Sequence, residues 1–285
     1  MTTMKRGTVH FCATLSWLIA WMSCGSASQL SGQEVQELSL ADLIERSEPA
    51  CVRIDVKYKD GNSGIGSGFV VDTERKWVVT NYHVVGDSVS ATVIFPDGVE
   101  ASVEGWRAHY TDFDLALLQI KTNKKLSALK VAQKLPRKGE SAVAIGAPSG
   151  LSFTASEGIV SGIRKGEELK QFGPKLKGTW LQTSTPISPG SSGGPLLNRS
   201  GEVLGVNSAT LAGAQNLNFA ISCDQINQLV RVGQKIRLRK LSELTPMSEA
   251  GSVPRGGASN DPESIVIKIP SQRRFRHRYD IEEDE

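Results

Sequence analysis

The chain has 285 residues, of which 39% are hydrophobic and 22% charged, a balance typical of a globular protein with a sizeable core. Its formal net charge is only +3, and two of those charges, Lys5 and Arg6, lie in a segment that we expect to be removed. So small a charge gives no indication of a nucleic-acid partner.

The N-terminus has the layout of a secretory signal peptide over residues 1–28: a short basic start, an apolar run over 9–22, and small residues up to Ser28. The apolar run is shorter than the ~20 residues that a membrane-spanning helix needs, so we expect no stable membrane span. The sequence therefore predicts an exported protein, periplasmic or extracellular, with a linker over residues 29–37.

Of the four cysteines, Cys12 and Cys24 fall within the predicted signal peptide, which leaves Cys51 and Cys223 in the mature chain. In an exported protein these two could form one disulfide or stay separately buried, and the sequence leaves both open. Neither has His or Cys neighbours at metal-site spacing, and we expect no metal or other cofactor. Lipid attachment through Cys24 is an alternative that Trp21 disfavours.

A short helix is predicted over residues 39–49, with Ser39 as its N-cap and Pro49 at its end. After it the pattern changes to short β-branched or apolar runs separated by Gly, Pro, Asp and Asn. We predict strands at 51–58, 68–72, 77–80, 90–95, 101–106, 115–120, 141–146, 158–163, 179–183, 195–198, 202–207 and 217–221. Many short strands without helices between them indicate an all-β fold built from antiparallel barrels or a sandwich.

The C-terminal part begins with an amphipathic helix over about 223–235, for which Ser222 is a candidate N-cap and Gln225 its capping partner. From about Leu241 the composition is rich in Ser, Glu, Pro and Gly, and the chain ends in a block of charges. We predict a polar, disordered tail over residues 236–285.

Residues 189–195, Pro-Gly-Ser-Ser-Gly-Gly-Pro, place two serines between glycines and prolines. Such a stretch is suited to a tight turn. It is also suited to a nucleophile, because successive N–H groups in a Gly-rich turn can hold an oxyanion. The stretch alone does not decide between the two.

A nucleophilic serine needs a base, and the base needs an orienting acid. With one histidine in the signal peptide and one in the tail, the base is His83 or His109; we favour His83, at the end of an apolar strand, and read His109 as exposed. For the acid, Asp114 directly precedes the apolar run LALLQI and is favoured over Asp112.

The order of these residues along the chain excludes one alternative. The stretch GSSGG also fits the nucleophile elbow of α/β-hydrolases, in which the acid and the histidine follow the serine. Here both candidates precede Ser192, and no helix follows it.

Three stretches together resemble the trypsin-like serine proteases, and within them the bacterial HtrA (Deg) branch. They are GSGFVVDTERKWVVTNYHVV, DFDLALLQI and LQTSTPISPGSSGGPLLNRSGEVLGVNSA. The resemblance covers about residues 38–232, which gives a trypsin-like protease domain over 38–235. It implies two six-stranded antiparallel Greek-key barrels with the catalytic triad at their junction.

By the same resemblance, the catalytic residues are His83 as general base, Asp114 as its orienting acid and Ser192 as nucleophile. The backbone N–H groups of Gly190 and Ser192 form the oxyanion hole. The implied activity is that of a serine endopeptidase that hydrolyses unfolded or damaged polypeptides through an acyl-enzyme.

The substrate pocket implied by the resemblance is formed by Pro186, Ile187, Val206, Asn207 and Ser208. None of these is a carboxylate, so we expect small or medium apolar residues at the cleaved bond, not Arg or Lys.

The sequence departs from the branch at its end, because the 50 or so residues after the closing helix are too few and too polar for a PDZ domain. A homotrimer is common in the branch, but residues 29–50 contain no aromatic side chain to anchor it, and the oligomeric state stays open. The competing interpretation is a catalytically latent or non-catalytic binding protein on the same fold.

Overall fold

The computed structural model describes residues 38–147, 153–172, 177–211, 217–246 and 267–268. All of them belong to one unit of the chain, Gln36–Glu285. The predicted signal peptide and linker lie outside the described residues, as does most of the predicted tail.

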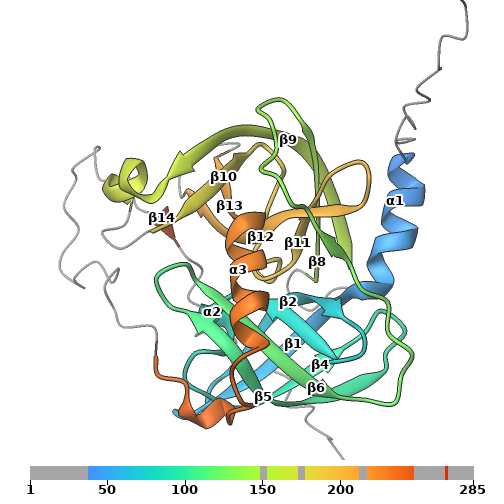
Figure 1. The fold of residues 1–285 in the computed structure, drawn as a ribbon, viewed down its shortest axis with the longest axis vertical. Coiled ribbons are helices and arrows are strands. Elements are labelled where there is room, and N and C mark those ends of the chain that lie inside the picture. Colours follow the sequence, from blue (N-terminus) through green and yellow to red (C-terminus); the bar gives the residue numbers. More distant parts are fainter. Residues whose placement is uncertain (1–37, 148–152, 173–176, 212–216, 247–266, 269–285) are drawn as a thin grey trace, which may run out of the picture. The chain divides into compact units, whose positions relative to one another are not determined.

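The strands form two six-stranded antiparallel barrels, as predicted (Figure 1). The first barrel runs in the order β1-β2-β3-β6-β5-β4 and closes through the pairing of β1 with β4. Its strands are β1 (Cys51–Tyr58), β2 (Ser63–Asp72), β3 (Trp77–Thr80), β4 (Ser88–Ile94), β5 (Glu100–Tyr110) and β6 (Leu115–Lys121).

The second barrel runs in the order β11-β8-β9-β10-β13-β12 and closes through the pairing of β11 with β12. Its strands are β8 (Ser141–Gly146), β9 (Thr154–Lys165), β10 (Thr179–Thr183), β11 (Pro195–Leu197), β12 (Glu202–Leu211) and β13 (Asn218–Ser222). Two short strands, β7 (Lys130–Val131) and β14 (Ile267–Lys268), pair with β12.

Short helices flank the barrels. The α-helices are α1 (Leu40–Ser47), α2 (Tyr82–Val85) and α3 (Cys223–Gly233), and the 3-10 helices are η1 (Glu48–Ala50), η3 (Gly166–Phe172) and η4 (Leu241–Glu243). Ser39 caps α1 as predicted, since its Oγ accepts the N–H of Asp42 at 3.1 Å. Ser222 is the N-cap residue of α3, as predicted, but the predicted capping hydrogen bonds are absent, because the hydroxyl of Ser222 and the amide of Gln225 both donate to the carbonyl of Thr179.

Two hydrophobic clusters form the core, and β3 contributes to both. Val78 packs inside the first barrel, whereas Trp77 and Val79 pack in the cluster that fills the second barrel and its boundary with the first. The neighbouring strand β6 is divided in the same way, with Leu118 on one side and Leu117 on the other. Trp77–Val79 and Leu115–Leu118 are continuous apolar runs because both faces of the two strands are buried there.

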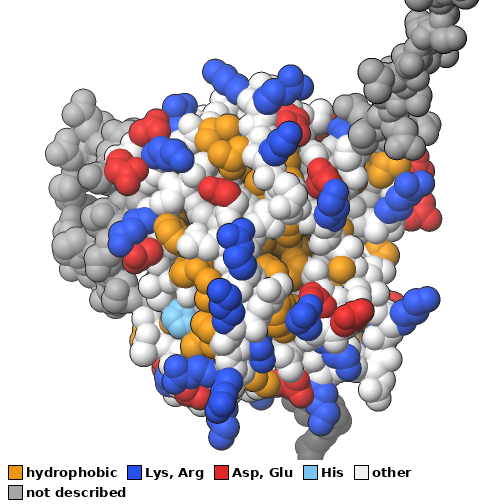
Figure 2. All heavy atoms as spheres, in the orientation of Figure 1, with side chains coloured by type: hydrophobic (Ala, Val, Ile, Leu, Met, Phe, Trp, Pro, Cys, Tyr) orange, Lys and Arg blue, Asp and Glu red, His pale blue; other side chains and the backbone are white. Residues whose placement is uncertain are grey.

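Charged side chains cover the outside with both signs interspersed over the visible face (Figure 2). Cys51 and Cys223 are both buried and free, so the separately buried thiols, and not the disulfide, are what the structure contains. Burial raises the pKa of the Cys223 thiol to about 11 and raises that of Cys51 further.

The ordered fold extends beyond the predicted boundary at residue 235. Residues 236–246 pack on the first barrel, where Leu241 and Leu244 are buried. Arg239 forms a β-bridge with Trp106, and the hydroxyl of Tyr82 donates to the carbonyl of Thr245 at 2.7 Å. Composition assigned this segment to the tail because its two buried leucines lie among polar residues.

His109 is not the exposed residue that we predicted. It lies in β5, where its ring packs between Tyr82, at 5.0 Å between centroids, and Trp106, at 4.6 Å. The strand predicted to end at residue 106 continues to Tyr110 and carries His109 into these contacts.

Candidate active site

The pairing of β3 with β6 brings His83 and Asp114 together. Thr80 at the end of β3 lies opposite Ala116 near the start of β6, so the residues just beyond Thr80 face those just before Leu115. The chain leaves β3 through Asn81 into α2, which carries His83. Asp114 adopts a left-handed conformation, φ +53°, one that aspartate tolerates better than most residues.

Asp114 holds His83 by two hydrogen bonds, each of 2.8 Å. Its Oδ2 lies against Nδ1 of the imidazole, and its Oδ1 accepts the backbone N–H of His83. The alternative acid, Asp112, is exposed and pairs with Lys177 instead. The carboxylate is almost fully buried, so it fixes both the orientation of the ring and the position of its proton on Nδ1.

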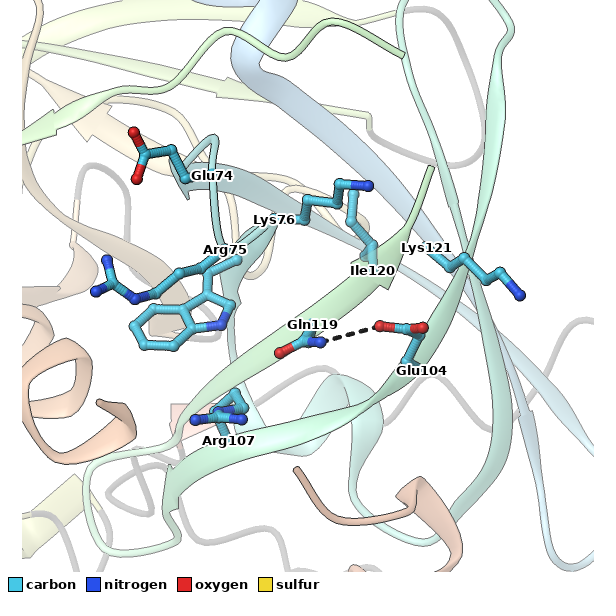
Figure 3. Close-up of a pocket in the computed structure, with 9 residues that line it drawn as sticks. Glu74, Arg75, Lys76, Glu104, Arg107, Gln119, Ile120 and Lys121 are labelled. Atoms are coloured by element: carbon cyan, nitrogen blue, oxygen red, sulfur yellow. Dashed lines mark hydrogen bonds between the residues drawn. The ribbon is translucent and has the colours of Figure 1, made fainter. Parts of the chain in front are cut away.

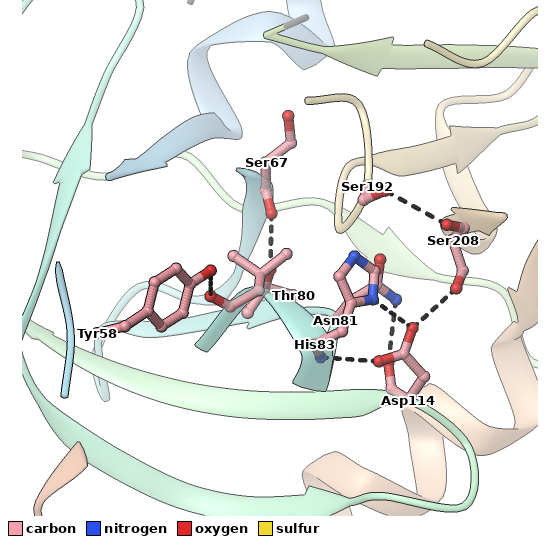
Figure 4. Close-up of polar contacts among 9 residues, drawn as sticks. Tyr58, Ser67, Thr80, Asn81, His83, Asp114, Ser192 and Ser208 are labelled. Atoms are coloured by element: carbon pink, nitrogen blue, oxygen red, sulfur yellow. Dashed lines mark hydrogen bonds and ion pairs between the residues drawn. The ribbon is translucent and has the colours of Figure 1, made fainter. Parts of the chain in front are cut away.

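Ser208 provides a third contact to this carboxylate. Its hydroxyl donates to Oδ2 of Asp114 at 2.8 Å. The sequence placed Ser208 in the substrate pocket and gave no signal for this contact, which joins β12 of the second barrel to the acid of the first. Among the described residues, the hydrogen-bond donors to the carboxylate therefore come from His83 and Ser208 (Figure 4).

Ser192 lies in the loop between β10 and β11, on the second barrel. Its side chain is buried, and its hydroxyl donates to the carbonyl of Ser208 at 3.3 Å. In Figure 4 the imidazole of His83 lies between Asp114 and Ser192. The second ring nitrogen, Nε2, is buried and has no hydrogen-bond partner in the described part of the chain.

The loop around Ser192 is held by backbone hydrogen bonds. Ser191 donates to Ser188 at 2.9 Å, Gly193 to Asn207 at 2.8 Å and Gly194 to Ser191 at 3.0 Å. Gly190 and Gly193 have φ of +98° and +90°, which explains the glycines that flank the two serines. Within the described residues, the N–H groups of Gly190 and Ser192 donate no hydrogen bond.

Ser67 of β2 contacts this loop and was missed by the sequence analysis. Its hydroxyl donates to the carbonyl of Gly190 at 2.6 Å, and its N–H donates to the carbonyl of Ser192 at 2.8 Å. The available signal was its place in the stretch GSGFVV, where glycines on both sides of a serine permit close approach of another backbone.

The five predicted pocket residues have different environments. Val206 is buried in the core, and the side-chain amide of Asn207 donates to the carbonyl of Pro195 at 3.1 Å. Pro186 is exposed and Ile187 half-buried. The side chains of Val206 and Asn207 therefore hold β12 in place, and the side chain of Ser208 bonds to Asp114.

A separate concavity of about 390 Å³ lies on the outside of the first barrel (Figure 3). It is lined mainly by charged and polar side chains of β5, β6 and the turn between β2 and β3, together with Trp77. None of its lining residues belongs to the site around Ser192.

The described residues contain no group of three or more His, Cys, Asp or Glu side chains that could hold a metal ion. In the same part of the chain, no helix is long and apolar enough to cross a membrane.

Sequence comparisons match this chain to known proteases. The trypsin-like peptidase domain family matches residues 66–206. The chain is 36% identical over 206 residues to the mitochondrial serine protease HTRA2 of Bos taurus and 34% identical over 214 residues to the serine protease Do-like HtrB of Bacillus subtilis. It is also 36% identical over 181 residues to the periplasmic serine endoprotease DegP of Escherichia coli. The chain belongs to the HtrA branch of the trypsin-like serine proteases.

Solved structures agree with this assignment. The HtrA-type protease AlgW with tripeptide superposes on this chain with a TM-score of 0.60 and 28% sequence identity, covering 68% of this chain and 63% of that one. The matches to HTRA2, HtrB and DegP cover 69%, 67% and 60% of this chain, but only 43%, 46% and 36% of those proteins. The chain thus spans less than half the length of these relatives.

Proposed function

We propose that this HtrA-type domain is a serine endopeptidase in which His83, Asp114 and Ser192 form the catalytic triad. The observation that carries the proposal is the state of the His83 ring. Asp114 fixes Nδ1 at 2.8 Å, while Nε2 is left without a partner on the side of Ser192 (Figure 4). This is the arrangement that a general base needs, because the free nitrogen can accept a proton while the bonded one stabilises the imidazolium.

In the proposed reaction, Oγ of Ser192 bonds to the carbonyl carbon of the substrate and its proton passes to Nε2 of His83. The carbonyl oxygen becomes an oxyanion, which the free N–H groups of Gly190 and Ser192 can bind. The C–N bond then breaks, the amine leaves with the proton from His83, and an acyl-enzyme remains. A water molecule then bonds to the acyl carbon and gives a proton to His83. The ester bond to Ser192 breaks, the carboxylic acid is released, and Oγ of Ser192 takes the proton back from His83.

The proton transfer requires one change at Ser192. Its hydroxyl donates to the carbonyl of Ser208, so it has to turn toward Nε2 before attack. Catalytic hydrogen bonds often tighten only when substrate is bound. The same contact favours a second candidate, a latent form in which Ser192 stays bonded to Ser208 until a substrate or partner binds.

For substrates, we propose unfolded or damaged polypeptides cleaved after small or medium apolar residues. The stretches around Pro186 and Val206 offer no carboxylate to pair with a basic side chain. We further propose that residues 1–28 direct export to the periplasm or the extracellular space. Relatives named as periplasmic serine endoproteases support that location.

Fluorophosphonate labelling of the purified protein, with the modified peptide located by mass spectrometry, tests the proposal. We expect labelling at Ser192 that is lost in Ser192→Ala and reduced at least about 1,000-fold in rate in His83→Ala. Labelling at another serine, or labelling that does not depend on His83, would rule out the proposed triad. A folded protein that is labelled only after addition of a denatured polypeptide would identify the latent form.

A further inference from the structure

We infer that Ser67 is a positioning residue that holds the nucleophile loop in the conformation that can bind an oxyanion. The inference rests on the proposed function, because it concerns the two N–H groups assigned to the oxyanion hole. It identifies a contact between the barrels that is separate from the triad. Ser67 lies on β2 of the first barrel, whereas the loop belongs to the second.

The Ser67 side chain uses both of its hydrogen-bonding functions in a buried position. Its hydroxyl donates to the carbonyl of Gly190 at 2.6 Å and accepts the N–H of Ala147 at 3.0 Å. The backbone of Ser67 makes two further bonds: its N–H donates to the carbonyl of Ser192, and its carbonyl accepts the Thr80 hydroxyl at 2.7 Å. One residue of the first barrel thus holds two carbonyl groups of the loop.

These contacts fix alternate peptide groups of the loop at both ends. The peptide between Gly190 and Ser191 is bonded to Ser67 through its carbonyl and to Ser188 through its N–H. The peptide between Ser192 and Gly193 is bonded to Ser67 through its carbonyl and to Asn207 through its N–H. Because a peptide group is planar, two bonds at opposite ends define its orientation.

The two N–H groups without partners lie next to these fixed peptides. The N–H of Ser192 belongs to the peptide between them, and the N–H of Gly190 to the peptide just before. The peptide between Gly190 and Ser191 links the two peptides that carry these N–H groups. A rotation of this peptide therefore changes the backbone dihedral angles that determine how the two N–H groups are oriented relative to each other. Without the Ser67 hydroxyl, the carbonyl of Gly190 loses its bond to the first barrel, and that rotation becomes easier.

The two barrels fit closely at this point, so the loop has little room to move away from Ser67. A Cβ atom built at Gly193 would overlap the carbonyl oxygen of Ser67 and the hydroxyl of Thr80. A Cβ atom at Gly146, next to Ala147, would lie 2.8 Å from Cα of Ser191. The loop therefore rests between β2 and the end of β8. Ser67 bonds to the loop at Gly190 and to Ala147, the residue just after β8.

Steady-state kinetics on Ser67→Ala, with a peptide substrate identified by product analysis, tests the inference. We expect kcat to fall about 10- to 100-fold with little change in KM, because misplaced groups lose transition-state stabilisation more than substrate binding. Ser67→Cys keeps a weak donor at the same place, and its kcat should lie between those of the wild type and Ser67→Ala. Ser222→Ala is the matched control: it removes a buried serine hydroxyl that donates to a carbonyl at 2.9 Å, away from the loop.

Hydrogen–deuterium exchange gives a second measurement that does not depend on activity. In Ser67→Ala, peptides covering residues 186–196 should exchange at least severalfold faster than in the wild type, and in Ser222→Ala they should not. If the wild type is neither labelled nor active, the proposed function fails, and this measurement still decides the role of Ser67. Unchanged exchange in the loop, or equal losses of kcat in Ser67→Ala and Ser222→Ala, would overturn the inference.

Discussion

Asp114 accepts two hydrogen bonds from His83, one from the ring and one from the backbone N–H, both at 2.8 Å. The backbone bond ties the start of α2 to the loop before β6, so the carboxylate positions the residue as well as the ring. The Ser208 hydroxyl adds a third bond, to the same oxygen as the ring. The acid thus joins α2 of the first barrel to β12 of the second.

Replacing Asp114 with Asn should lower kcat by about 10⁴-fold. An amide can present an N–H group where the carboxylate accepts the proton on Nδ1, which would favour the wrong tautomer of His83. Peptidase kinetics and the rate of fluorophosphonate labelling measure the effect. Asp112→Asn is the matched control, since Asp112 is exposed and pairs with Lys177, and it should leave both rates unchanged. Similar losses in the two variants would contradict this role of Asp114.

Gly193→Ala should lower the free energy of unfolding by at least about 2 kcal/mol and abolish labelling of Ser192. The residue has φ of +90°, and a Cβ atom would overlap Ser67 and Thr80. Gly61→Ala is the control, because Gly61 also has a positive φ but faces open space. Chemical denaturation of both variants measures the difference, and a loss no larger in Gly193→Ala than in Gly61→Ala would show that the overlap is relieved without cost.

The packing of His109 should make stability depend on pH below neutrality. Burial, and then the positive charge of Arg239, hold the pKa of His109 below its ordinary value of 6.5. The unfolded chain therefore binds more protons than the folded protein as the pH falls through 6.5, and stability present above that pH is lost below it. His109→Phe keeps a ring between Tyr82 and Trp106 but cannot titrate.

Thermal unfolding at pH 7.5 and pH 5.5 tests this expectation, with Ser192→Ala as the background to prevent self-cleavage. The decrease in Tm on acidification should be smaller in His109→Phe than in the parent. An equal decrease in the two proteins would exclude His109 as a source of the pH dependence.

Leu244→Ala should lower the free energy of unfolding by about 2 to 4 kcal/mol, because Leu244 is fully buried against the first barrel. Leu238→Ala, at a position 38% exposed in the same segment, should change it by less than about 1 kcal/mol. Denaturant unfolding of both variants makes the comparison. If Leu244→Ala were as stable as the wild type, residues 236–246 would not belong to the folded domain.

Most of the secondary structure could be predicted from the sequence, because each strand carries its own pattern of β-branched residues between turn residues. The strand positions, the helix at Leu40–Ser47 and the helix after Ser222 were found in this way. The candidate residues His83, Asp114 and Ser192 also came from the sequence, since each lies in a motif with its own chemical requirement. Their order along the chain was enough to exclude an α/β-hydrolase.

Only the tertiary structure decided which residues meet across the chain. Ser67 and Gly190 are far apart in sequence, as are Ser208 and Asp114. The glycines beside Ser67 show that another backbone can approach it, but no local pattern tells which distant carbonyl or carboxylate a serine hydroxyl will bond. The same holds for His109 and Leu244, whose burial depends on β5 and on the packing of residues 236–246. Local patterns determine strands and motifs because they act through neighbouring residues, whereas the closure of the two barrels determines the contacts that hold the site.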